Sequence, residues 1–446
     1  MIREIGASPD FIIEFGKKCV RCGQCRSVCP VFTEFKTEGF SPRARVFLAD
    51  MIHRSCKGST VALNSRGPAH IDYADSSPDA RTFTDNAPTD ILKKAWDRNL
   101  ICLLCGACAT DCPSGVPVCD IILSMRKEYV AHGGRPKLVA ELSQRIRETH
   151  NVVGEDNENR WLWMEEHTPI SVHSECQVTP LRRPQGLVYF TGCVASLYPG
   201  AYKIPRSMIQ IMNRTGIGFA LLGGEEWCCG YPLSLLGLDS EADEIAGHNL
   251  EKVVGLGADT VMTSCPSCYY TWRHLIEKTG AHITVIHYTQ LLNGIVADQA
   301  VKLSPMEVVA TYHDPCDLGR KSGIYDPPRE VLRSIPGLTF NEITPSRKDA
   351  RCCGGGGNLE TIDPELSRKL AEARLSQASD TGAELIVTAC QQCARTLSNA
   401  ARKLPRTRNM PYGDSEPPRP DMEITVPRKM KVRDIADIVL SCLQSP

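Results

Sequence analysis

The chain of 446 residues carries a pattern of five cysteines that occurs twice. The first set is Cys193, Cys228, Cys229, Cys265 and Cys268, and the second is Cys316, Cys352, Cys353, Cys390 and Cys393. Matching cysteines are 123, 124, 124, 125 and 125 residues apart, as an internal duplication would leave them. Thiolates bind soft metals. The pattern therefore predicts two equivalent metal sites, each gathered from three separate loops.

Two further cysteine runs precede this duplication. Cys19, Cys22, Cys25 and Cys29 before Pro30 follow the spacing C-x2-C-x2-C-x3-C-P, and Cys102, Cys105, Cys108 and Cys112 before Pro113 repeat it. In bacterial ferredoxins three cysteines of such a run hold one 4Fe-4S cluster and the fourth crosses to the other. We expect Cys19, Cys22, Cys25 and Cys112 to hold one cubane cluster, and Cys102, Cys105, Cys108 and Cys29 the second. Zinc sites usually use paired CxxC knuckles instead.

Composition and charge narrow the class of protein. The 22 cysteines are about 5% of the residues and lie mostly in CxxC or CC groups, which favours metal ligation over a disulfide scaffold. A net charge of -1 without a long basic tract makes nucleic acid an unexpected partner. No apolar run approaches the ~20 residues of a spanning helix. We expect a cytoplasmic protein that reaches a membrane only through a partner.

The elements that must position the duplicated cysteines are those of a parallel sheet. Each repeat alternates short apolar runs with helical patterns, which is typical of α/β folds. We predict strands at 187–191, 260–263, 308–312 and 385–388 and helices at 241–255 and 364–378. Ligands of such sheets gather beyond the carboxyl ends of the strands. The cysteines that directly follow a predicted strand are Cys193, Cys265, Cys316 and Cys390.

The remaining segments complete the expected domain organisation. A helix at 118–131 follows the second ferredoxin-type run, and a polar insert at 57–90 is expected to be a surface loop. Trp161 and Trp163 either dock the connector onto a neighbour or form an ordinary packed pair. We expect a helical, two-cluster ferredoxin-type domain at 1–140, a connector at 141–185, and Rossmann-like α/β repeats at 186–300 and 301–446.

The residues around the duplicated cysteines resemble those of a known family. The runs that carry the likeness are Trp227-Cys228-Cys229-Gly230, Thr263-Ser264-Cys265-Pro266-Ser267-Cys268, His313-Asp314-Pro315-Cys316, Cys352-Cys353-Gly354-Gly355-Gly356-Gly357-Asn358 and Val387-Thr388-Ala389-Cys390. With them the chain resembles the CCG-domain iron-sulfur oxidoreductases, most closely the D-type subunits of heterodisulfide reductases, in which a C-type ferredoxin part and a B-type CCG part are fused. The resemblance covers nearly the whole chain. One departure is Gln391, where a proline is common.

The resemblance implies both cofactors and chemistry. It assigns a noncubane 4Fe-4S cluster to each set of five cysteines, with zinc in one site as the minor alternative, and places the two clusters across a pseudo-twofold axis. Cleaving a disulfide takes two electrons, whereas a ferredoxin cluster delivers one at a time. The paired clusters would hold the intermediate, each binding one sulfur. The ferredoxin-type clusters would feed them from a flavoprotein partner, and other iron-sulfur subunits are possible neighbours.

A second resemblance supports a rival function. Ser41-Pro42-Arg43-Ala44-Arg45 and Cys112-Pro113-Ser114-Gly115-Val116-Pro117 are similar to runs in the iron-sulfur subunits of glycolate and lactate oxidases. The alternative is therefore a pure electron relay, either of a flavin-dependent 2-hydroxyacid oxidase or of an electron-bifurcating aromatic acyl-CoA reductase complex. The flavoprotein partner would be a heterodisulfide reductase A-like protein, an electron-transferring flavoprotein or a flavin oxidase.

A few polar residues near the predicted cluster face have two interpretations. His313 and His287 are candidate proton donors to a leaving thiolate or are structural histidines. Arg320 and Lys321 either steer an anionic substrate or are solvated. The cysteines outside every motif are expected to be unligated thiols: Cys56, Cys119, Cys176 and Cys442.

Overall fold

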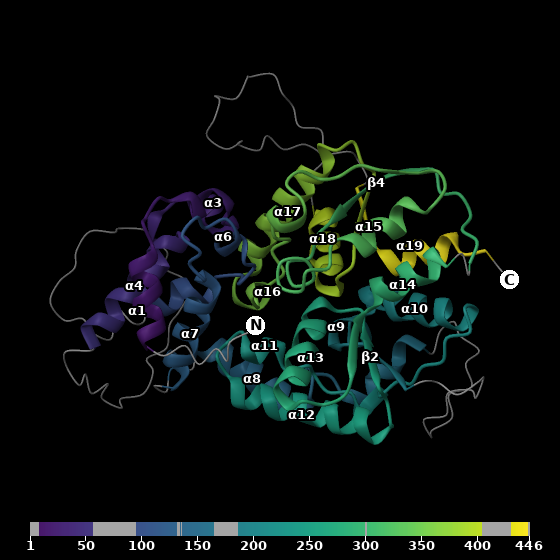
Figure 1. Cartoon of the computed structure of the whole chain (residues 1–446), viewed down its shortest axis with the longest axis horizontal. Coiled ribbons are helices and arrows are strands. Elements are labelled where there is room, and N and C mark those ends of the chain that lie inside the picture. Colours follow the sequence, from purple (N-terminus) through teal and green to yellow (C-terminus); the bar gives the residue numbers. More distant parts are fainter. Residues whose placement is uncertain are drawn as a thin grey trace.

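The computed structural model describes residues 9–56, 95–131, 134, 136–164, 186–298, 301–403 and 430–444. The insert predicted at 57–90 and residues 165–185 of the predicted connector lie outside the described residues. Figure 1 shows the N-terminal helices on one side of the molecule, with the two α/β repeats beside them. Among the helices of the described ranges, none is long and apolar enough to cross a membrane.

The N-terminal part is built from short helices around the two cysteine runs. Its elements are α1 (Pro9–Lys18), α2 (Gln24–Val28), α3 (Pro30–Phe35), the 3-10 helix η1 (Glu38–Phe40), α4 (Pro42–Cys56), a helical segment at 95–100, α6 (Ala107–Thr110) and α7 (Val118–Ala131). The helix predicted at 118–131 is thus confirmed. The first run ends where α3 begins, because proline fits the first turn of a helix.

The predicted connector contributes two elements. α8 (Lys137–Thr149) and the 3-10 helix η2 (Asn157–Met164) link the N-terminal part to the first repeat. Trp163 is only 2% exposed and belongs to the core of the repeats, and Trp161 packs against the same core. Trp161 lies so close to Gly223 that a Cβ there would collide with its indole ring. The tryptophan pair therefore docks this segment onto the first repeat.

The first repeat contains a three-stranded parallel sheet. The strand order is β1-β2-β3, with β1 (Leu187–Phe190), β2 (Thr260–Thr263) and β3 (Thr284–His287). Its helices are α9 (Cys193–Leu197), η3 (Pro199–Ala201), α10 (Lys203–Arg214), η4 (Gly223–Glu225), α11 (Tyr231–Ser234), α12 (Asp239–Gly255), α13 (Pro266–Thr279) and α14 (Tyr288–Ala297). Both strands predicted for this repeat are present, and β3 adds to them at the edge of the sheet.

The second repeat has a four-stranded parallel sheet. The order is β5-β4-β6-β7, with β4 (Val308–His313), β5 (Leu338–Phe340), β6 (Leu385–Thr388) and β7 (Lys431–Asp434). Its helices are α15 (Asp326–Arg333), η5 (Arg347–Asp349), α16 (Leu359–Ile362), α17 (Pro364–Ser379), α18 (Gln391–Lys403) and α19 (Ile435–Cys442). The prediction of a mixed helical and parallel-sheet α/β chain is confirmed.

The three parts share their hydrophobic cores. One core joins Tyr189 and Met208 of the first repeat to Val387 and Ile438 of the second. Another contains residues of the N-terminal part and of both repeats, including Leu100, Leu236 and Leu359. Burial of apolar surface stabilises at roughly 25 cal/mol per Å², so these shared cores hold the cysteine-bearing loops in fixed relative positions.

Candidate metal centres

The cysteines of the first ferredoxin-type set lie near the surface. Cys22 is exposed, whereas Cys19, Cys25 and Cys112 are partly buried. Burial raises the pKa of the Cys25 thiol, and the nearby Cys19, Cys112 and Cys22 raise it further, so these four sulfurs are neighbours. Val116 N–H lies 3.4 Å from Cys112 Sγ, which shows how the loop offers backbone donors to sulfur.

The second ferredoxin-type set consists of buried cysteines around a cavity. Cys29, Cys102, Cys105 and Cys108 all line it, together with Arg45. The Arg45 side chain is 2% exposed, and its Nε and Nη2 have no hydrogen-bond partner among the described residues. An unpaired buried guanidinium is costly. An anionic 4Fe-4S cluster among the four thiolates would satisfy it, so the residues present fit that cofactor.

A fifth thiol lines the same cavity. Cys119, at the start of α7, is hydrogen-bonded to Cys108, which lowers the pKa of Cys119. Sequence reasoning placed it outside every motif. Cys442, by contrast, is buried in the hydrophobic core of the two repeats. Cys176 and the side chain of Cys56 lie outside the described residues.

The first set of five cysteines is buried at the carboxyl ends of β1 and β2. All five thiols are buried: Cys193, Cys228, Cys229, Cys265 and Cys268. Cys228 is hydrogen-bonded to Cys193, which lowers the pKa of Cys193 to about 7. Cys229 contacts both Cys228 and Cys268. The three loops predicted from the sequence therefore meet at one place.

A buried ion pair supports this first set. Arg160 of η2 donates from Nη2 to Cys193 Sγ at 3.1 Å and from Nη1 to Glu226 Oε1 at 2.7 Å. Both ionic side chains are 1% exposed. Glu226 also accepts from the backbone N–H groups of Thr191 and Gly192, each at 2.8 Å. Burial raises the pKa of Glu226, and Arg160 opposes that effect. Sequence reasoning missed this pair, because neither residue stands in a cysteine motif.

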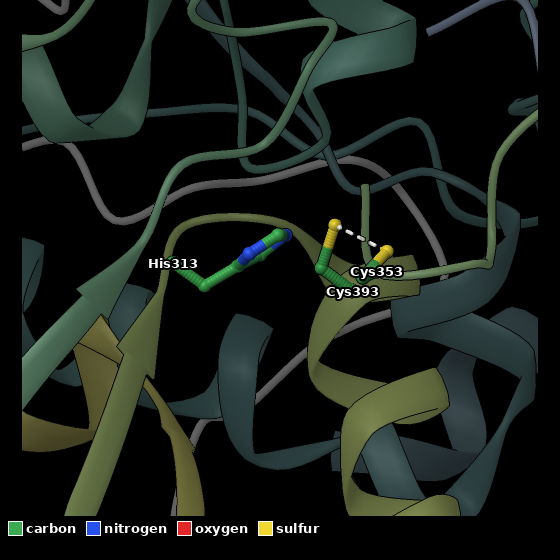
Figure 2. A group of neighbouring side chains, drawn as sticks. All are labelled: His313, Cys353 and Cys393. Carbon is green, nitrogen blue, oxygen red and sulfur yellow. Dashed lines mark hydrogen bonds between the residues drawn. The ribbon is translucent and has the colours of Figure 1, made fainter. Parts of the chain in front are cut away.

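The second set of five cysteines follows β4 and β6. Cys352, Cys353, Cys390 and Cys393 are buried, and Cys316 is partly buried. The Sγ atoms of Cys353 and Cys393 are 3.2 Å apart (Figure 2). Gly355 N–H lies 3.4 Å from Cys353 Sγ. Gly354 and Gly357 have φ values of +88° and +64°, a region that strongly favours glycine.

His313 points at the sulfurs of this second set. Figure 2 shows its imidazole directed from the end of β4 toward Cys353 and Cys393, and ligand atoms of the three residues lie within 4.8 Å of one another. Arg374 Nε donates to His313 Nδ1 at 3.2 Å. His313 Nδ1 is therefore occupied as an acceptor, and its buried Nε2 has no hydrogen-bond partner among the described residues.

His287 has a different environment. It is fully buried at the end of β3, and burial lowers its pKa to about 3, so the imidazole is neutral at physiological pH. Its Nδ1 lies 2.8 Å from Thr289 Oγ1, and its backbone N–H donates to Gln290 Oε1 at 2.9 Å. These bonds organise the first turn of α14, which is a structural role.

Arg320 and Lys321 are neither solvated nor free. Arg320 donates to the backbone carbonyls of Cys105 (2.7 Å), Lys348 and Ala350. Lys321 Nζ lies 2.8 Å from Asp317 Oδ1 and also donates to the Tyr231 hydroxyl. Both cations therefore join parts of the molecule that are distant in the sequence.

The second ferredoxin-type set and the second five-cysteine set are in contact. Cys105 is hydrogen-bonded to Cys352, which lowers the pKa of Cys105 to about 5. The glycine run 354–357, which follows Cys353, packs on the loop that carries Cys102 and Leu103. A Cβ at Gly357 would lie 2.6 Å from both Cys102 O and Leu103 Cα. Glycine at 357 is thus required by this close approach of two backbones.

These sites define an iron-sulfur protein with a ferredoxin-type part and two cysteine-rich repeats. The cysteine-rich domain family, CCG, matches residues 187–273 and 310–398, and a 4Fe-4S dicluster domain matches residues 16–116. The chain belongs to the CCG-domain iron-sulfur oxidoreductase family. The match to the dicluster domain indicates 4Fe-4S clusters in the N-terminal part.

Curated relatives cover most of the chain. The D-type subunit of the dihydromethanophenazine:CoB--CoM heterodisulfide reductase of Methanosarcina barkeri is 32% identical over 400 residues, which are 85% of this chain and 88% of that protein. Its counterpart in Methanosarcina acetivorans is 30% identical, and the match covers 86% of this chain and 89% of that protein. EtfAB:quinone oxidoreductase of Syntrophomonas wolfei is 25% identical over 86% of this chain and 55% of its own length.

Proposed function

We propose that this chain is the iron-sulfur electron-transfer subunit of a multi-subunit oxidoreductase. The two five-cysteine sets are called the CCG sites, the first around Cys193 and the second around Cys352. The chain carries electrons between a flavoprotein partner and these paired CCG sites, where thiol-disulfide redox chemistry takes place. The observation that carries the proposal is the close approach of the loop bearing Cys102 and Cys105 to the second repeat, where Gly357 packs on Cys102 O and Arg320 donates to Cys105 O, beside the interaction of Cys105 with Cys352. Without such a contact the two kinds of site would have no short route between them.

The proposed ligand sets are those that share a cavity or a cluster of sulfurs. Cys19, Cys22, Cys25 and Cys112 hold one cubane 4Fe-4S cluster, and Cys29, Cys102, Cys105 and Cys108 the other. Each five-cysteine set holds a noncubane 4Fe-4S cluster, and the two are related by the pseudo-twofold of the duplication. Backbone N–H groups near Cys112 and Cys353 would donate to these sulfurs and so favour their anionic form.

The exposure of the first set and the interaction of Cys105 with Cys352 give the proposed route its order. Exposed Cys22 marks the end at which a partner docks. Electrons then pass to the buried set around Cys105, on to Cys352 of the second repeat, and finally to the first repeat. At the CCG sites two electrons and two protons convert one disulfide into two thiols. The flavoprotein supplies the electrons singly, and His313 Nε2, facing Cys353 and Cys393, is a candidate proton donor.

A relay without its own substrate is the second candidate. It is supported by the relative named EtfAB:quinone oxidoreductase, of which this chain covers 55%. In that case the electrons leave from the first repeat to another carrier. The chain would then serve an oxidase or an acyl-CoA reductase complex, and the same four sites would conduct without changing a bond.

Iron content tests the number of clusters. Anaerobically purified protein is expected to contain about sixteen irons per chain, four for each of the four clusters. Replacing Cys352 and Cys353 together by serine is expected to lower the content to about twelve, because the second CCG site loses two ligands. The matched control is Cys442→Ser, a buried thiol of the core, which leaves the content unchanged. About eight irons in the unchanged protein would contradict the noncubane clusters.

A disulfide test separates the enzyme from the relay. The reduced protein is mixed anaerobically with a disulfide, and its electron paramagnetic resonance spectrum and the oxidation of a reduced dye are followed. Thiol-disulfide chemistry predicts a disulfide-dependent signal and dye oxidation, both lost in the Cys352→Ser, Cys353→Ser protein. If the fully loaded protein gives neither, the relay is correct.

A further inference from the structure

Gln391 connects the two CCG sites through a buried side chain. It directly follows Cys390 of the second set and is fully buried at the start of α18. Its Nε2 donates to Thr191 O at 2.7 Å and to Ser264 Oγ at 2.9 Å, and its Oε1 accepts from Ala195 N–H at 3.0 Å. All three partners belong to the first repeat, so this amide crosses between the repeats.

The three partners flank cysteines of the first set. Thr191 and Ala195 lie two residues before and two residues after Cys193, and Ser264 directly precedes Cys265. A Cβ at Gly192 would lie 3.4 Å from Gln391 Oε1 and 3.3 Å from Cys268 Sγ. The amide of Gln391 is therefore within van der Waals distance of the segment that carries the first five-cysteine set. Its backbone directly follows Cys390, which belongs to the second set.

The matching position of the first repeat lacks this device. Pro266 follows Cys265 at the start of α13, just as Gln391 follows Cys390. Proline has no polar side-chain group and cannot make such bonds. The adjacent Gln392 donates to Glu360 and to Thr396 Oγ1, both of its own repeat. Of these three positions, only Gln391 links the repeats.

We propose that Gln391 is a positioning residue that fixes the two CCG sites relative to each other and couples their reduction potentials. This inference rests on the proposed function, because it requires both five-cysteine sets to hold clusters. Both polar atoms of the buried amide are hydrogen-bonded across the junction of the repeats, which makes the link rigid. Hydrogen bonds and dipoles beside cluster ligands set cluster potentials. A change at Gln391 therefore alters the first site from within the second repeat.

The test is a redox titration of the full-length, cluster-loaded protein followed by electron paramagnetic resonance. Gln391→Ala is expected to change the distribution of an electron between the two CCG sites at least tenfold, which is about 59 mV for a one-electron couple. The ferredoxin-type signals stay in place. Gln392→Ala, the matched control, leaves all signals where they are. Gln391→Glu keeps the length of the side chain and adds a negative charge, so it lowers the potential of the first site.

A protein that lacks the first CCG site tests whether the effect of Gln391 depends on that site. In protein carrying Cys265→Ser and Cys268→Ser, Gln391→Ala is expected to leave the second site unchanged. Two results would overturn the proposed role of Gln391 and leave the proposed function standing. One is a shift in the potential of the second site that persists in full when the first site is missing. The other is no shift at all in the complete protein that contains about sixteen irons. About eight irons in the unchanged protein would instead overturn the proposed function. If the Gln391→Ala protein does not take up clusters, the Gln391→Glu protein is the test. A lower potential of the first site supports the proposal, and an unchanged potential overturns it.

Discussion

Replacing Arg160 by methionine is expected to lower the free energy of unfolding by about 3–5 kcal/mol, the usual cost of stranding one charge of a buried pair. Glu226 would lose the cation 2.7 Å away while staying 1% exposed. Cys193 would also lose the donor 3.1 Å from its sulfur. The first CCG site should then lose iron or show an altered resonance signal. Denaturant unfolding and iron analysis measure the two effects.

A second substitution separates the charge effect from the packing effect. Glu226→Gln in the Arg160→Met protein removes the unpaired charge and keeps one oxygen, which can accept from one of the two backbone N–H groups of Thr191 and Gly192. We expect this double variant to recover a large part of the lost stability. It should not recover the signal of the first site, since the donor to Cys193 is still missing. An Arg160→Met protein as stable as the parent would show that the pair is dispensable.

Replacing Gly357 by alanine is expected to slow electron transfer from the ferredoxin-type part to the CCG sites at least tenfold. The new Cβ would lie 2.6 Å from two backbone atoms, Cys102 O and Leu103 Cα, neither of which can rotate away. The ferredoxin-type loop must therefore move off the second repeat, and the contact between Cys105 and Cys352 opens. Stopped-flow reduction under anaerobic conditions, monitored at both kinds of cluster, measures the transfer.

Gly382 provides the matched control for this change. Its φ of +72° is close to the +64° of Gly357, but a Cβ there would meet no atom of the described residues within 4 Å. Gly382→Ala therefore imposes the same backbone strain, of order 1–3 kcal/mol, without a collision between domains. Equal transfer rates in the two alanine variants would show that the close approach at Gly357 does not set the route.

Much of the fold could be predicted because its signals are local. The helix at 118–131 has a regular apolar period and a clear end. The four predicted strands are short apolar runs shortly before cysteines, and all four are present. The edge strands β3, β5 and β7 gave weaker signals, because strands of three or four residues with exposed positions lack a clear pattern. Sheet pairing across distant segments supplies what their own residues do not.

The sequence by itself determined that this chain is an iron-sulfur protein. Cysteine spacing is a local property, since a short loop wrapping a metal dictates the number of residues between ligands. The duplication likewise follows from the offsets between cysteines alone. The ligand spacing and the duplication can therefore both be recognised without knowing which segments of the chain are in contact. The family is evident from the sequence for the same reason, because its motifs are contiguous runs.

Only the tertiary structure decided how the sites are connected and tuned. Arg160 comes from a segment that looked like a plain connector, yet it donates to Cys193. Gln391 looked like a missing proline, yet its amide spans the two repeats. The contact of Cys105 with Cys352 joins residues that are far apart in the chain. Such pairings depend on how the shared cores pack, and packing of distant segments leaves no period or spacing in a single sequence.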